Sequence, residues 1–111
     1  MQPIELRSDN CAGAAPEIMA ALAAADAGSA LAYGGDDHSA HLRDLAREVF
    51  GHPETEVFPV LSGTAANALG LAALCPPWGS VLCHETAHIY RSECGATSMF
   101  GAGAVMRGLP G

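Results

Sequence analysis

The stretch that decides the fold lies at residues 61–67 and reads LSGTAAN. It follows an apolar run at 57–61, VFPVL, which predicts a short buried strand. It leads into an alanine- and leucine-rich segment at 65–74, which predicts a helix. The Ser-Gly-Thr sequence at 62–64 would therefore occupy a strand-to-helix turn.

Such a turn is suited to a phosphate group. The first amides of a helix lack internal partners and carry partial positive charge. Glycine lets the backbone approach a ligand closely, and the two flanking hydroxyls can donate further hydrogen bonds. The simpler alternative is that one of these hydroxyls only caps the helix.

The composition limits the class of protein. The chain has 111 residues, enough for one small domain, and a formal net charge of −7. This charge argues against nucleic acid or an anionic membrane as a partner, and apolar runs such as 18–25 are too short to span a bilayer. The first residues lack a signal-peptide pattern, so we expect a cytoplasmic protein whose four cysteines are reduced.

The N-terminal half predicts two helices and a loop. Residues 4–10 predict a short strand or an extended arm that ends in a turn. Residues 16–26 predict a helix with proline in its first turn. Residues 32–37, AYGGDD, predict a loop, and residues 42–50 predict an amphipathic helix that Gly51 ends.

The C-terminal half continues the alternation. Residues 80–83 predict a second buried strand, 90–100 have weak helical character, and 102–107 predict a third strand before a turn at 108–111. From residue 57 the order is strand, helix, strand, helix, strand, which is typical of a parallel α/β sheet. Ligands of such sheets bind beyond the carboxyl ends of the strands.

The sequence HETAH at 84–88 formally matches the zinc motif H-E-x-x-H. Because it follows a strand-like run, His84 is expected to end a strand and not to share a helix with His88. The downstream candidates for a third ligand, Glu93 and Cys94, are also very close in sequence. We therefore expect no metal. Both histidines could be surface residues, or His88 alone could stack on a ring and move protons near neutral pH.

Four motifs in order resemble the N-terminal part of the threonine aldolases, which are pyridoxal 5'-phosphate (PLP) enzymes of fold type I. The motifs are RSDN at 7–10, AYGGDD at 32–37, SGTAAN at 62–67 and ETAH at 85–88, and ECGA follows at 93–96. Asn10 resembles the low-specificity branch. The resemblance implies an α/β fold, the incomplete N-terminal part of a three-layer α/β/α large domain with a mostly parallel sheet. Residues 1–13 would be an N-terminal arm and residues 14–111 the first part of the PLP-binding domain.

The resemblance also implies roles for individual residues. Ser62, Gly63 and Thr64 are expected to bind the phosphate of PLP. His88 is expected to stack on the pyridine ring and is a candidate for the base that takes the β-hydroxyl proton.

Two residues are expected to contact the substrate. Ser8 would bind its carboxylate, and Tyr33 would line the site, either of its own subunit or across a subunit interface. Glu93 lies near His88 in sequence without a defined role, and a structural hydrogen bond is at least as good an interpretation.

The implied reaction is cleavage of L-threonine, L-allo-threonine and related β-hydroxy-α-amino acids to glycine and an aldehyde. The family needs a Schiff-base lysine, and all five basic residues here are arginine. The expected acidic partner of the pyridine nitrogen is also absent. We therefore expect a fragment, inactive alone, of an enzyme that forms a homo-oligomer, either a dimer or a tetramer.

Three alternatives stay open at this point. The parent enzyme could be another PLP enzyme of fold type I, such as a β-eliminating or aminotransferase-like enzyme. The chain could be a truncated, non-catalytic binding or assembly protein, which the missing lysine would favour. The remaining alternative is the zinc hydrolase.

Overall fold

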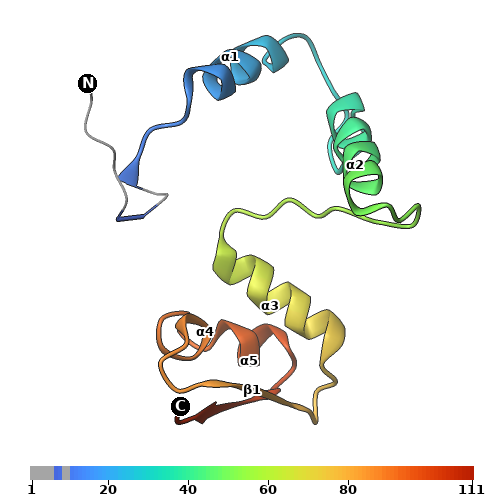
Figure 1. Cartoon of the computed structure of the whole chain (residues 1–111). Helices are drawn as coiled ribbons and strands as arrows, with labels where there is room; N and C mark the ends of the chain where they lie inside the picture. Colours follow the sequence, from blue (N-terminus) through green and yellow to red (C-terminus); the bar gives the residue numbers. More distant parts are fainter. Residues whose placement is uncertain (1–6, 9–10) are drawn as a thin grey trace. The chain divides into compact units, whose positions relative to one another are not determined.

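The computed structural model describes residues 7–8 and 11–111 (Figure 1). The chain divides into two compact units, Met1–Glu56 and Val57–Gly111, which we describe separately. The strand or arm predicted at 4–10 lies outside the described residues apart from Arg7 and Ser8.

The first unit contains helices α1 (Pro16–Ala25) and α2 (Asp37–Phe50). Helix α1 begins with its proline and carries Glu17 in the first turn, close to its predicted bounds. Helix α2 ends where predicted, at Gly51, which has the left-handed conformation with φ of 62°. The segment after α2 is held by Arg47, whose guanidinium donates to the Thr55 carbonyl at 3.1 Å and to the Glu56 carboxylate at 2.7 Å.

Helix α2 starts five residues before the predicted position. Asp36 is its N-cap, and its carboxylate accepts hydrogen bonds from the Ser39 amide at 2.8 Å and the Ser39 hydroxyl at 2.7 Å. The helix therefore begins at its cap and not at the first residue of the apolar stripe.

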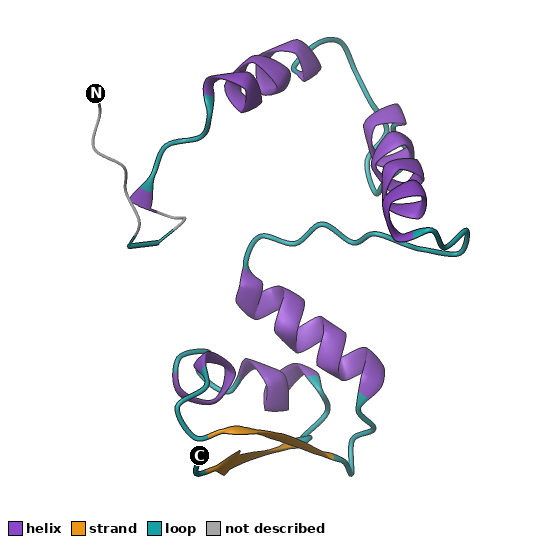
Figure 2. Ribbon diagram, in the orientation of Figure 1, coloured by secondary structure: helices purple, strands orange, loops and turns teal. Residues whose placement is uncertain are grey.

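The second unit contains the remaining elements of the chain (Figure 2). They are α3 (Gly63–Leu74), β1 (Ser80–His84), α4 (His88–Arg91), α5 (Ala96–Phe100) and β2 (Val105–Leu109). Strands β1 and β2 pair in parallel, with Ser80 opposite Val105 and His84 opposite Leu109, as the alternation of elements predicted. Helix α5 packs against α3 and also contacts β2, so it lies between the long helix and the strand pair.

Small side chains form the packed centre of this unit. Ala68 of α3, Thr97 of α5 and Ala104 are each 2% exposed. Gly101, which follows α5, is also buried, and a Cβ there would lie 2.7 Å from the Thr97 carbonyl oxygen. Only small residues therefore allow α3, α5 and the start of β2 to approach this closely.

The strand predicted at 57–61 is wrong. These residues have no strand conformation, and Phe58 and Leu61 are largely exposed. A strand needs a hydrogen-bonded neighbour, and the sheet of the described residues contains only β1 and β2. Pro59 also lacks the N–H group that a ladder would use. The Ser-Gly-Thr sequence is therefore preceded by a connection without regular secondary structure.

The turn predicted at 108–111 is also wrong in part, because Gly108 and Leu109 belong to β2. A Cβ at Gly108 would lie 2.9 Å from a ring carbon of Tyr90, which lies in α4. Glycine is used here to let an aromatic ring pack on the strand. No helix in the described part of the chain is both long enough and apolar enough to cross a membrane.

Candidate active site

The start of α3 has the features expected of an anion site. Ser62 is the N-cap, and its hydroxyl accepts a hydrogen bond from the Ala65 amide at 3.3 Å, so the capping role is confirmed. The amides of Gly63 and Thr64 are the first two of the helix and have no intrahelical acceptor. The first turn of α3 carries no acidic residue. Among the described residues, a Cβ at Gly63 would meet no packed neighbour within 4 Å, so the approach to these amides is open.

The two histidines of the HETAH sequence lie on different elements. His84 is the last residue of β1, and His88 is the first residue of α4. The His84 ring forms a hydrogen bond of 2.7 Å with the Thr86 hydroxyl in the turn between them. The helical zinc motif is therefore not formed, and the described ranges contain no cluster of three or more metal-binding side chains.

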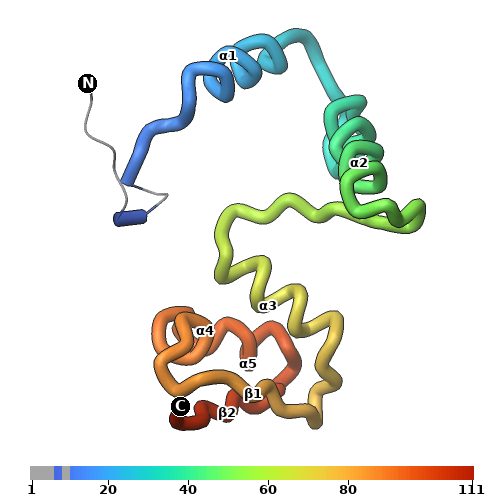
Figure 3. The backbone as a smooth tube through the Cα atoms, in the orientation of Figure 1, coloured from blue at the N-terminus to red at the C-terminus, as the bar shows by residue number. Residues whose placement is uncertain are grey.

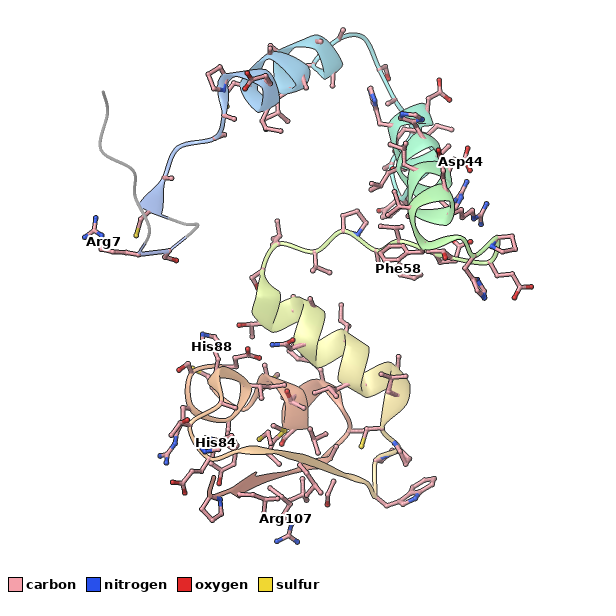
Figure 4. The ribbon with its side chains drawn as sticks, viewed as in Figure 1. Arg7, Asp44, Phe58, His84, His88 and Arg107 are labelled. Carbon is pink, nitrogen blue, oxygen red and sulfur yellow. The ribbon has the colours of Figure 1, made fainter. Side chains whose placement is uncertain are left out.

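His88 is tied to α3 through Glu93. Its Nδ1 atom lies 2.9 Å from Oε1 of Glu93, and the Asn67 amide nitrogen donates to the same oxygen at 2.8 Å. Asn67 lies about one turn into α3, beyond the Ser62 cap. Figure 4 shows His88 on the side of α4 that faces α3. The candidate phosphate site and the candidate base are therefore linked through a single hydrogen-bonded carboxylate.

The carboxylate and the imidazole differ sharply in exposure. The Glu93 side chain is 1% exposed, whereas the His88 side chain is 72% exposed. The hydrogen bond with His88 lowers the pKa of Glu93; burial acts in the opposite direction, and the Asn67 amide lowers it further. Glu93 is therefore ionised near neutral pH and can only accept hydrogen bonds. It follows that Nδ1 of His88 carries a proton, and Nε2 is the ring nitrogen available to a ligand.

The backbone after Glu93 explains how this carboxylate reaches α3. Cys94 and Gly95 both have left-handed conformations, with φ of 51° and 75°. They lie in the turn that connects α4 to α5, two helices that the tube in Figure 3 shows one after the other. The Ala96 amide closes the turn by donating to the Glu93 carbonyl at 2.9 Å.

Comparison with known proteins places the chain in a family. A family model described as "Beta-eliminating lyase" matches residues 5–111. The chain belongs to the β-eliminating lyase family. It is 46% identical over 100 residues to the low specificity L-threonine aldolase of Pseudomonas aeruginosa, covering 90% of this chain and 29% of that protein. It is 43% identical over 103 residues to the low specificity L-threonine aldolase of a Pseudomonas species, covering 93% of this chain and 30% of that protein.

The resemblance to threonine aldolases is thus confirmed for this member of the β-eliminating lyase family. The chain spans about three-tenths of the length of the curated relatives it matches. The parallel strand pair with its helices is the part of the predicted fold that the structure contains.

The two predicted substrate residues of this lyase-family chain lie in the first unit. Ser8 is exposed, and its carbonyl accepts a hydrogen bond from the Cys11 amide at 3.2 Å. Tyr33 has a fully exposed side chain and a left-handed backbone with φ of 60°, which is uncommon for a bulky residue. Their contribution to the site formed in the second unit stays a prediction.

The sequence alone identified neither the partner of Glu93 nor a role for Asn67. The structural hydrogen bond considered for Glu93 is present, and Asn67 makes a second one. A signal for Asn67 was available, because it is the only amide or charged side chain in the otherwise apolar segment 65–74. A polar residue on such a segment is expected to have a polar partner.

Proposed function

We propose that the complete protein is a PLP-dependent lyase that cleaves L-threonine, L-allo-threonine and related β-hydroxy-α-amino acids to glycine and an aldehyde. The observation that carries this proposal is the link between the start of α3 and His88 through Asn67 and Glu93. An anion site and a proton acceptor would then be held at a fixed separation. The names of the two relatives support the same reaction.

The residues at the start of α3 fit the phosphate of PLP. Two backbone amides without intrahelical acceptors, the Ser62 and Thr64 hydroxyls and a first helical turn without an acidic residue suit a dianion. Gly63 leaves the approach open. When bound, PLP supplies an electron sink for the pair released at the substrate's Cα atom.

His88 would perform the proton transfer. In our proposal its ring would stack on the pyridine ring of bound PLP, and Nε2 would accept the β-hydroxyl proton as the Cα–Cβ bond breaks. The aldehyde carbonyl forms from the same hydroxyl. Ser8 binds the substrate carboxylate, and Tyr33 lines the site.

These 111 residues contain no lysine. We propose that the lysine that holds the cofactor, and the acidic partner of its ring nitrogen, lie outside this sequence, and that the chain alone is inactive. In this proposal residues 1–13 are the N-terminal arm, and residues 14–111 are the first part of a three-layer α/β/α large domain.

Exposed apolar side chains support a larger assembly. Leu61, Leu74 and Trp78 are among the large apolar residues that are more than four-fifths exposed. Each strand of the sheet also has one edge without a partner among the described residues. Further parts of the same protein, and a second copy of it in a dimer or tetramer, are the proposed cover for these surfaces.

A second candidate is suggested by the family description, because a β-eliminating lyase releases a leaving group from Cβ and keeps the Cα–Cβ bond. The test uses the protein purified at the length encoded by its gene and supplied with PLP. We expect glycine and an aldehyde from L-threonine, L-allo-threonine and phenylserine. Formation of only a 2-oxo acid and ammonia, from an amino acid with a β-leaving group, would replace aldol cleavage by β-elimination.

A further inference from the structure

Glu93 is a buried charged residue that forms a hydrogen bond with the exposed side chain of His88. Burying a carboxylate is costly unless it is paired and hydrogen-bonded. Both of its partners, His88 and Asn67, are on Oε1, while Oε2 is buried without a hydrogen-bond partner in the described part of the chain. An apolar residue at this position would avoid that cost. The arrangement is better explained by what it does to His88 than by stability.

The Glu93 carboxylate restricts both the rotation of the His88 ring and the position of its proton. An exposed imidazole is otherwise free to rotate and to carry its proton on either nitrogen. The ionised carboxylate accepts only, so it selects the form with the proton on Nδ1, and the distance of 2.9 Å holds the ring in one direction. Asn67 donates to the same oxygen at 2.8 Å and so fixes Glu93 itself to α3.

We propose that Glu93, held by Asn67, is a positioning residue for aldol cleavage, which fixes the His88 ring with its proton on Nδ1 and Nε2 directed to the substrate. This inference rests on the proposed function. During cleavage the β-hydroxyl proton moves to Nε2, and the O–H electron pair forms the carbonyl bond of the aldehyde. The pair from the broken Cα–Cβ bond would stay with the Cα fragment, for which bound PLP would supply the electron sink. The imidazolium formed at His88 then lies against the Glu93 carboxylate, which stabilises it.

The first test measures which ring nitrogen of His88 carries the proton, and it does not depend on catalytic activity. The protein, purified at the length its gene encodes, is labelled with ¹⁵N-histidine, and a His88→Gln variant assigns the His88 signals. We expect neutral wild-type His88 to carry its proton on Nδ1. In Glu93→Gln, the amide offers both a donor and an acceptor, so we expect both proton positions at His88. A wild-type signal with the proton on Nε2 would overturn the proposal without the need for any variant.

The second test separates positioning from folding. We expect Glu93→Gln to lower kcat for L-threonine by about 10- to 100-fold, below the 10²- to 10⁴-fold that a general base contributes, with KM changed by less than about twofold. The control is Thr97→Val, because the Thr97 hydroxyl is buried like Glu93 but has no hydrogen-bond partner among the described residues. This control should leave kcat and the His88 signals unchanged.

The outcomes distinguish a failure of the Glu93 positioning role from a failure of the proposed aldolase function. An unchanged kcat with a single Nδ1–H form in Glu93→Gln would overturn the positioning role. Equal losses of kcat in Glu93→Gln and Thr97→Val would also overturn it, because the effect would be one of packing. If the His88 signals change as expected but wild-type protein cleaves no β-hydroxy amino acid, the proposed function fails while the proton assignment stands.

Discussion

Thr64→Glu is expected to change helix stability and phosphate binding in opposite directions. Thr64 is half-buried in the first turn of α3, where no acidic residue is present. A carboxylate at the start of a helix interacts favourably with its dipole, so the free energy of unfolding should rise by about 0.3–1 kcal/mol. The same carboxylate would occupy the place proposed for a phosphate.

The loss of phosphate affinity can be worked out from two contributions. Removal of one hydroxyl bonded to a charged group costs about 1.5–3 kcal/mol, or about 10- to 150-fold in Kd. Two unit charges 4 Å apart repel by about 1 kcal/mol even in bulk water. A phosphate carries nearly two charges, so repulsion of about 1.5–2 kcal/mol lowers the affinity by about another 10- to 30-fold. We therefore expect affinity to fall by about 100-fold or more. Thr64→Ala removes only the hydroxyl and should show only the first contribution.

The assay compares PLP with pyridoxal, which lacks the phosphate, by equilibrium titration of the full-length protein, alongside thermal unfolding without ligand. Thr64→Glu should lose affinity for PLP and keep its affinity for pyridoxal. Equal affinity of wild type and variant for PLP would remove the start of α3 from the cofactor site. An equal loss for both ligands would show that the substitution acts through the fold.

Three further predictions concern other parts of the chain. His88→Ala should lower aldol cleavage by about 10²- to 10⁴-fold with little change in unfolding temperature, and unchanged cleavage would defeat its role as base. The hydrogen bonds from Ser39 hold the pKa of Asp36 below its usual 3.8. The ionised Asp36 carboxylate therefore stabilises the folded state above pH 3.8, and this stabilisation is lost as the pH falls through the lower pKa of the folded state. Asparagine can also cap a helix but does not ionise. In acid titrations followed by circular dichroism, Asp36→Asn should therefore lose less helix than wild type. Gly51→Ala should destabilise the protein in urea unfolding by about 1 kcal/mol, because φ at this residue is 62°, and no loss would contradict the strain argument.

The helices were predictable because their signals are local. Pro16, the apolar stripe of 42–50 and Gly51 act within a few residues of one another, and the structure contains the helices that they predict. The start of α2 was missed because Asp36 contributes through its bonds to Ser39, which apolar periodicity does not report.

The strand predictions were correct only for segments that pair with another strand in the structure. Residues 80–83 and 102–107 each contain a run that pairs with the other in parallel, although β2 is displaced toward the C-terminus. Residues 57–61 have an equally apolar pattern but no neighbouring strand among the described residues, and they form no regular secondary structure. Whether an apolar run becomes a strand depends on groups distant in sequence.

The sequence by itself determined the family resemblance, the helix that follows the Ser-Gly-Thr turn and the separation of His84 from His88. Each can be inferred from short motifs and their order along the chain. Only the tertiary structure decided that Glu93, 26 residues after Asn67, joins it to His88. That contact depends on the packing of α5 on α3 and on the left-handed turn at Cys94 and Gly95. A buried carboxylate acquires its partners from the folded surroundings, so its role is visible only in three dimensions.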